Sequence, residues 1–134
     1  MFFALEFSDG IAIYEQIVRQ LKYAVAGGVL KSGELVPSVR ELARELAINP
    51  NTVARAYRQL QSDRVLDAVR GTGLEVAAGA AERCRGQRLM LIRTRLRQFV
   101  AEARQSGLDA AELRALVDKE LSAKEPAASG REGK

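Results

Sequence analysis

The segment from Pro37 to Tyr57, PSVRELARELAINPNTVARAY, constrains the fold of this chain most, because a proline divides it into two short helices. Pro50 has no amide hydrogen and disfavours helical geometry at Asn49, so the first helix must end before this point. Proline is tolerated in the first turn of a helix and asparagine is a favoured N-cap, so a second helix can begin at once. The pattern predicts two helices joined by a tight turn.

The first of these helices has a complete start signal. Ser38 stands three residues before Glu41, which is the spacing of a capping box. The residues that follow place apolar side chains at helical spacing on one side and charged side chains on the other. The apolar stripe consists of Val39, Leu42, Ala43 and Leu46.

The second helix has a polar face without a carboxylate. Its apolar face carries Val53, Ala56, Tyr57 and Leu60. Its polar face carries Asn51, Thr52, Arg55 and Gln59. Asparagine can pair bidentately with adenine and arginine with guanine, while threonine can contact thymine or phosphate. This face has the side chains of a major-groove reader, although any amphipathic helix exposes a polar face to solvent.

Composition narrows the class of protein. The chain has 134 residues, no histidine and one cysteine, Cys84. A disulfide framework is excluded, a zinc site is not expected, and the commonest general base is missing. No apolar run could span a membrane and no signal-peptide pattern is present, so we expect a cytoplasmic protein that is not an enzyme and needs no cofactor or metal.

The net charge of +4 is compatible with a polyanion-binding protein in general, but the charge distribution indicates where such a surface could lie. Residues 1–77 carry as many acidic as basic residues, so a reading surface there must be a local patch. The excess lies in an arginine run without an intervening acid. It could be a solvated helix face or could lie near the DNA backbone. The run consists of Arg83, Arg85, Arg88, Arg93, Arg95 and Arg97.

Three further elements precede or follow the two helices. Residues 2–7 are apolar enough for a short strand with a packing role, which Ser8-Asp9-Gly10 would end as a turn. Residues 13–25 predict an amphipathic helix closed by Gly27-Gly28, followed by a loop over residues 29–36. Residues 65–69 and 74–77 predict two strands of a hairpin.

The hairpin connection is the second basic feature. Its four residues are Arg70, Gly71, Thr72 and Gly73, and the glycines permit positive φ. A helix, a helix-turn-helix and a hairpin in this order predict a winged helix, whose basic tip can touch phosphate or the minor groove. A purely structural hairpin is the alternative, but it does not explain an arginine at the tip.

With these motifs in place, the segment YEQIVRQLKYAVAGGVLKSGELVPSVRELARELAINPNTVARAYRQLQSDRVLDAVRGTGLEV resembles the winged-helix DNA-binding domain of the GntR family of bacterial transcription regulators. The resemblance lies in the YEQI opening, the G-x-L-x-x-G-x-x-x-PS-x-R-ELA core and the RG-x-G wing. INPNTVARAY and the short tail most resemble the YtrA subfamily.

The resemblance implies DNA contacts for specific residues. It implies them for Arg40, for Asn49, Asn51 and Thr52, and for the wing residues Arg70, Gly71, Thr72 and Gly73. The commoner family pattern has arginines where Pro50 and Ala54 stand here. Base readout is therefore expected to shift toward Asn51 and Arg55.

The C-terminal part predicts two amphipathic helices. In the first, apolar residues alternate steps of three and four, the a/d spacing of a coiled-coil seam: Leu89, Ile92, Leu96 and Phe99. Ser106-Gly107 stops it, and Asp109 with Glu112 caps a second helix. That helix carries Leu113, Leu116, Val117 and Leu121.

These two helices can bury little by themselves. We expect them to pack against the same pair of a second subunit, which gives a homodimer and an inverted-repeat operator in double-stranded DNA. The alternative is that both fold back on their own winged-helix domain. The YtrA resemblance also favours a dimer. The tail is too small to enclose a typical small-molecule pocket, so an effector, if one exists, would bind at the dimer interface or between tail and wing.

Together these features predict a mostly helical α+β chain. Residues 1–77 would form the winged helix-turn-helix DNA-binding domain, residues 78–125 a two-helix dimerisation tail, and residues 126–134 a disordered C-terminus. The predicted function is a homodimeric, sequence-specific transcription regulator acting as a repressor. A winged-helix module for protein–protein interaction, with the tail as docking surface, is the alternative.

Overall fold

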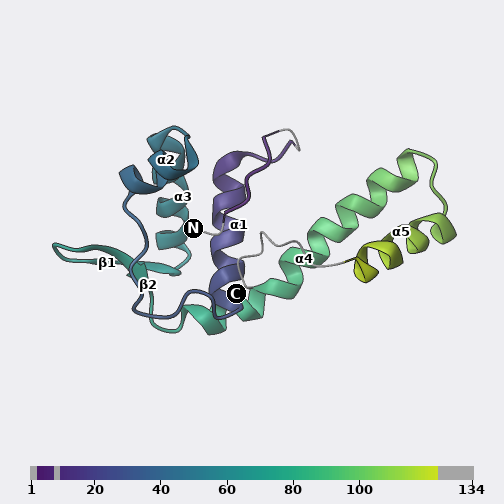
Figure 1. Ribbon diagram of the computed structural model, residues 1–134. Helices are drawn as coiled ribbons and strands as arrows, with labels where there is room; N and C mark the ends of the chain where they lie inside the picture. The colour runs from purple at the N-terminus through teal and green to yellow at the C-terminus, as the bar shows by residue number, and fades with distance from the viewer. Residues whose placement is uncertain (1–2, 8–9, 124–134) are drawn as a thin grey trace. The chain divides into compact units, whose positions relative to one another are not determined.

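The computed structural model describes residues 3–7 and 10–123. They form two compact units, one over residues 3–89 and one from residue 90 onward. The predicted class, mostly helical α+β, is confirmed (Figure 1). In chain order the elements are α1 (Ile13–Ala26), α2 (Val39–Leu46), α3 (Pro50–Ser62), β1 (Leu66–Val69), β2 (Gly73–Val76), α4 (Ala80–Gln105) and α5 (Ala110–Ser122).

The first unit is built on three helices, with α3 packed against both α1 and α2. Each helix contributes its apolar stripe to one core, as the spacing predicts. The largest fully buried side chains of these helices are Ile17, Leu21, Val25, Leu42, Val53 and Leu60. Packing on two sides leaves only one face and the N-terminal end of α3 open to solvent.

The helix-turn-helix forms as the local signals predict. Ser38 Oγ accepts a hydrogen bond from the amide of Glu41 at 3.0 Å, and the amide of Ser38 donates to Glu41 Oε1 at 2.9 Å. Helix α2 ends at Ala47, which has a left-handed φ of 57°. Asn49 then caps α3 through its side-chain oxygen, which accepts from the amide of Asn51 at 2.8 Å.

A buried tyrosine ties the two helices of this motif together. The hydroxyl of Tyr57 on α3 donates to the carbonyl of Pro37, just before α2, at 2.7 Å. Burial raises the pKa of the Tyr57 phenol far above its usual value, so the hydroxyl keeps its proton and remains a donor. The start of α2 is thereby fixed against the middle of α3.

The hairpin predicted as a wing is present, with each strand within one residue of its expected bounds. Strands β1 and β2 pair antiparallel, with Leu66 opposite Val76 and Val69 opposite Gly73. The chain before α2, predicted as a loop, also pairs with β2. The amide of Val36 donates to Leu74 O at 2.9 Å, and the amide of Gly33 donates to Val76 O at 2.8 Å. The chain before α2 therefore lies beside β2 like a short third strand of the wing.

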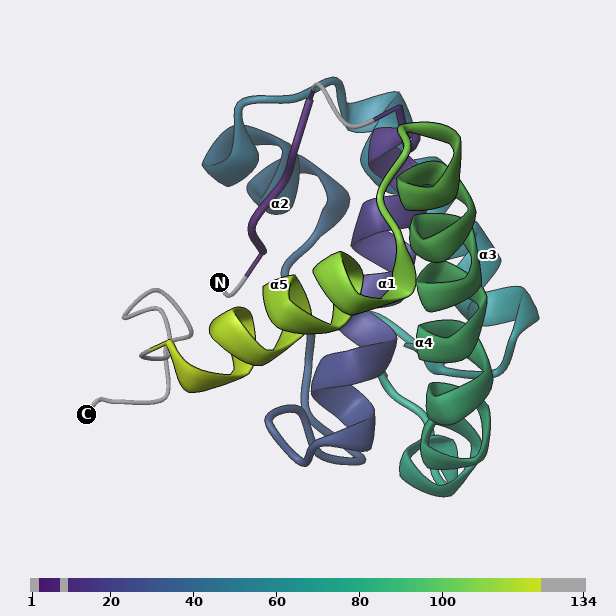
Figure 2. The same cartoon turned by 90° about the vertical axis from the view of Figure 1, so that its right-hand side faces the viewer.

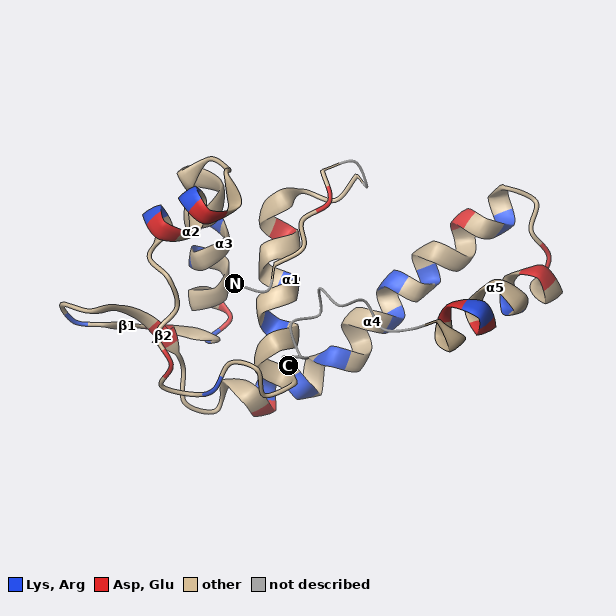
Figure 3. Ribbon diagram, viewed as in Figure 1, with Lys and Arg blue, Asp and Glu red and all other residues tan. Residues whose placement is uncertain are grey.

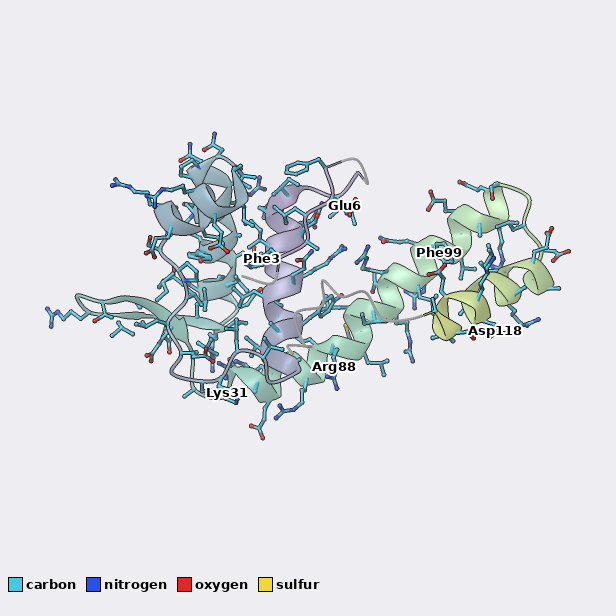
Figure 4. All side chains as sticks on the ribbon, viewed as in Figure 1. Phe3, Glu6, Lys31, Arg88, Phe99 and Asp118 are labelled. Carbon is cyan, nitrogen blue, oxygen red and sulfur yellow. The ribbon has the colours of Figure 1, made fainter. Side chains whose placement is uncertain are left out.

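The prediction of a strand over residues 2–7 is wrong for residues 3–7, and residue 2 and the turn residues 8 and 9 lie outside the described part. Side-chain amides of α1 pair with this arm in place of a neighbouring strand. Gln20 exchanges two hydrogen bonds with the backbone of Ala4 at 2.8 and 2.9 Å, and Gln16 exchanges two with Glu6 at 2.7 Å each. The arm therefore lies alongside α1, as the predicted packing role requires (Figure 4).

Two polar contacts secure the C-terminal side of the first unit. Lys22 on α1 forms an ion pair with Asp63, at the end of α3, at 2.8 Å. Arg83, in the first turn of α4, donates to the carbonyls of Arg64 and Ala78. The start of α4 is thus attached to the chain just after α3.

The second unit contains the rest of α4 and α5, which are joined by a tight turn, and α5 runs at a wide angle to α4 (Figure 2). Gly107 makes the turn with a φ of 94°, and the amide of Leu108 donates to Ala103 O. The predicted cap of α5 is confirmed, because Asp109 and Glu112 form a complete capping box at 2.8 and 3.0 Å. The tail predicted to be disordered, residues 126–134, lies outside the described residues.

Candidate nucleic-acid interface

The exposed residues of the helix-turn-helix gather around the start of α3. Asn51, in the first turn, and Arg55, one turn later, are exposed, and Thr52 between them is partly exposed. The turn residue Asn49 is also exposed, but its side-chain oxygen is engaged in the cap. Only its amide nitrogen remains to donate to a ligand. Arg40 is exposed on α2.

Residues from two helices line a hollow of about 360 Å³ at this end of α3. Within it, the guanidinium carbon of Arg55 lies 3.8 Å from the centre of the Tyr14 ring on α1. Ala12 and Ile13 complete the α1 side, and Asn51 and Thr52 complete the α3 side. The start of α1 therefore borders the polar face of α3.

Sequence reasoning missed Tyr14 as part of this site. Its position in the apolar stripe of α1 predicts a packing residue, and it is in fact only partly buried. No spacing rule connects it with Arg55, because the two belong to different helices far apart in the sequence. A tyrosine beside a helix start is too common to stand out as a signal.

The wing presents its tip to solvent. Arg70, Gly71 and Thr72 are all exposed, and the amide of Thr72 donates to Val69 O at 2.9 Å to close the turn. Gly71 and Gly73 have φ values of 75° and 136°, which disfavour any residue with a side chain. The hairpin projects from the helices with a basic end (Figure 3).

The carboxylate of Glu41, on α2, is held in a fixed position by its capping box. Glu41 is exposed, and hydrogen bonds from Ser38 keep the pKa of its carboxyl below the usual value. The carboxylate thus stays charged and in its capping position at neutral pH.

The arginine run on α4 divides into two kinds of residue. Arg83 is partly buried and its guanidinium is engaged with backbone carbonyls, so it has a structural role. The others are exposed along the helix (Figure 3): Arg85, Arg88, Arg93, Arg95 and Arg97.

The described part of the chain also bears on three other kinds of feature: a metal site, a reactive cysteine and a membrane-spanning helix. Residues 3–7 and 10–123 contain no group of three or more histidine, cysteine or acidic residues placed to hold a metal ion. Cys84 is buried, which raises the pKa of its thiol above the usual value. None of the helices described is both long and apolar enough to cross a membrane.

Three packed helices, a capped helix-turn-helix and a hairpin with a basic tip define the winged helix-turn-helix class. Residues 13–76 match the family described as bacterial regulatory proteins, gntR family. The chain is 35% identical over 111 residues to the HTH-type transcriptional repressor YtrA of Bacillus subtilis, an alignment that covers 83% of this chain and 85% of that protein.

Solved structures agree with the sequence comparison. A transcriptional regulator from Oenococcus oeni shares 31% identity with a TM-score of 0.60, covering 88% of this chain and 98% of that one. YtrA from Sulfolobus acidocaldarius, a GntR-family transcription factor, shares 29% identity with a TM-score of 0.57, covering 75% and 99%. The chain belongs to the GntR family, as a DNA-binding transcription regulator of the YtrA type.

Proposed function

We propose that this protein is a homodimeric repressor that binds an inverted-repeat operator and occludes a promoter in the cytoplasm. The observation that carries the proposal is the exposed start of α3, where Asn51, Thr52 and Arg55 lie together with donors and acceptors suited to base edges. An arginine and an asparagine one turn apart can each make a bidentate contact in the major groove.

The remaining candidate residues would position the protein on the duplex. Arg40 and the side-chain amide nitrogen of Asn49 would contact the sugar-phosphate backbone of the DNA beside α3. The wing residues Arg70, Gly71, Thr72 and Gly73 would contact phosphate or the adjacent minor groove. The tip has no side chain at two of these four positions, so the backbone can approach the DNA closely.

The tail supports the dimer. Leu96 on α4 is 53% exposed and Phe99 is 44% exposed, although both belong to the apolar seam. On α5, Leu116, Val117 and Leu121 are exposed as well, and Leu113 is partly buried. Ile92 and Leu89 extend the exposed seam toward the start of α4. Exposed apolar patches of this kind mark interaction surfaces, and a second copy would cover them with the same residues.

Repression is supported by similarity alone. The Bacillus subtilis relative is named a transcriptional repressor, and the alignment includes most of both chains. A bound dimer at a promoter would exclude polymerase without any further domain. A hollow of about 410 Å³ within the tail, lined by residues of α4 and α5 such as Phe99 and Val117, is large enough for a small-molecule effector, contrary to the expectation from the short tail.

Selection of bound duplexes from a randomised DNA pool tests the proposal. We expect enrichment of an inverted repeat with two half-sites, and an affinity that falls steeply with salt, with a log–log slope of about −0.9 per phosphate contacted. Arg55→Ala should lower affinity at one base position by about 1–3 kcal/mol if Arg55 pairs with guanine. A folded protein that enriches no sequence and binds without salt dependence would instead favour the protein-interaction module.

A further inference from the structure

We propose that Tyr14 is a positioning residue for DNA recognition, and that its ring holds the guanidinium of Arg55 in the orientation that contacts DNA. The inference rests on the proposed function and extends the recognition site beyond the helix-turn-helix, to the first turn of α1.

The contact has the geometry of a cation stacked on an aromatic face. The guanidinium carbon lies 3.8 Å from the ring centre, well inside the distance of about 6 Å at which such pairs attract each other. Arginine stacks on aromatic rings with its plane against the ring. Tyr14 is partly buried and Arg55 is exposed, so the ring forms the inner wall and the charge faces outward.

The ring is mounted on a rigid support. Helix α1 packs against α3 through buried residues such as Ile17 and Leu21. The chain leading into α1 is also held, because Gln16 Nε2 donates to the carbonyl of Ile11 at 2.9 Å. The backbone on both sides of Tyr14 is therefore fixed relative to the helix that carries Arg55.

Stacking leaves the donors of Arg55 free. A guanidinium carries its five N–H groups in its plane, so a ring against one face does not block them. Within residues 3–7 and 10–123, Arg55 contacts the Tyr14 ring and makes no ion pair or hydrogen bond. The N–H fork can therefore meet the O6 and N7 acceptors of guanine, or two oxygens of a phosphate, in an arrangement that exists before DNA binds.

Long side chains lose rotamer freedom when they bind, and a restraint in the free protein reduces that loss. Removing the ring should therefore weaken DNA binding only through Arg55. Tyr14→Leu removes the ring and keeps an apolar side chain in the stripe of α1. Tyr14→Phe keeps the ring and removes only the hydroxyl, so it is the matched control.

The test is a double-mutant cycle with the duplex selected by the wild-type protein. We expect Tyr14→Leu to weaken binding about 2- to 5-fold, the size of one exposed cation–π contact, and Tyr14→Phe to bind within about 2-fold of wild type. In an Arg55→Ala background, Tyr14→Leu should have no further effect. An equal loss in both backgrounds would show that Tyr14 acts through folding and would overturn the inference.

Substituted duplexes distinguish the two possible contacts of Arg55. If it reads guanine, both Tyr14→Leu and Arg55→Ala should relax preference at the same base pair. If it binds phosphate, both should weaken all sequences alike. Loss at different positions would contradict the coupling.

Nuclear magnetic resonance of the free protein separates the stack from the proposed function. The δ-methylene protons of Arg55 should be shifted upfield by the ring in the wild type and in Tyr14→Phe, and should return to ordinary positions in Tyr14→Leu. Unchanged shifts in Tyr14→Leu would overturn the inference even if DNA binds. Shifted protons in a protein that selects no DNA would instead reject the proposed function and, with it, a role in recognition.

Discussion

Two residues of the first unit adopt backbone conformations that residues with side chains disfavour. Ala47, in the helix-turn-helix turn, has a φ of 57°, and Arg64, after α3, has a φ of 62°. A non-glycine residue in this region costs roughly 1–2 kcal/mol relative to its preferred conformations. Both positions follow helix ends, where glycine is the usual residue. Hydrogen bonds that close the two helix ends, from the amide of Ile48 to Ala43 O and from the amide of Val65 to Leu60 O, accompany these conformations.

Arg64→Gly should therefore stabilise the fold by up to about 1 kcal/mol, since glycine removes the strain but adds freedom to the unfolded chain. Arg64→Ala is the matched control, because it removes the side chain and keeps the β-carbon. Thermal unfolding of both variants measures the difference. A glycine variant no more stable than the alanine variant would show that backbone strain is not significant at this position.

The ion pair between Lys22 and Asp63 gives the stability a defined dependence on pH. Burial alone would raise the pKa of the Asp63 carboxyl, but hydrogen bonds from Lys22 and Gln59 outweigh it and lower the pKa below the usual value of about 3.8. A carboxyl with a lowered pKa in the folded state contributes stability above its unfolded pKa and loses it as the pH falls through the folded one.

We expect a contribution of about 1 kcal/mol that is constant from neutral pH down to about pH 5 and declines below about pH 4. Asp63→Asn should be less stable at pH 7 and lose less stability on acidification. Denaturant unfolding at several pH values measures both effects. Parallel pH curves for the variant and the wild type would contradict this role.

At the scale of elements, capping boxes start two of the helices. Ser38→Ala should destabilise the first unit by about 1 kcal/mol, because the amide of Glu41 loses its acceptor near the helix start. Ser38→Asp is the control, since aspartate is also a good N-cap. Urea unfolding of both variants decides whether the cap contributes as expected.

Local signals explain which elements could be predicted from the sequence. The caps at Ser38, Asn49 and Asp109 and the glycines of the wing act within a few residues, so sequence reasoning locates them correctly. The pairing of Val36 with β2 and the amide contacts of the arm depend on residues distant in the sequence. They leave no periodicity, because the paired segments are too short to alternate. The contact between Tyr14 and Arg55 is hidden because the two residues lie on different helices far apart in the sequence.

At the scale of the whole molecule, the apolar tail should decide the oligomeric state. Phe99→Glu places a charge in the exposed apolar seam, and we expect it to convert a dimer into a monomer at micromolar concentration. Gln98→Glu adds the same charge at the neighbouring exposed position and should remain dimeric. Size-exclusion chromatography with light scattering measures both masses.

A monomeric wild-type protein would remove the basis for the dimer, and an unchanged mass for Phe99→Glu would exclude this seam as the interface. DNA binding by the monomeric variant supplies a second readout. A monomer has one winged helix-turn-helix domain and can make only half of the dimer's DNA contacts. We therefore expect the variant to bind a full operator much more weakly than the wild type while retaining its half-site preference.

The arm beside α1 has a consequence for hydrogen exchange. The amides of Ala4 and Glu6 belong to no helix or strand, yet each donates to a glutamine side chain of the first helix. Amides in irregular segments normally exchange with solvent quickly, whereas these two should exchange slowly and in step with each other. A pair of protected amides would thus appear in a stretch without secondary structure, and replacing Gln16 or Gln20 with leucine, which has no acceptor, would speed the exchange of the amide that it holds.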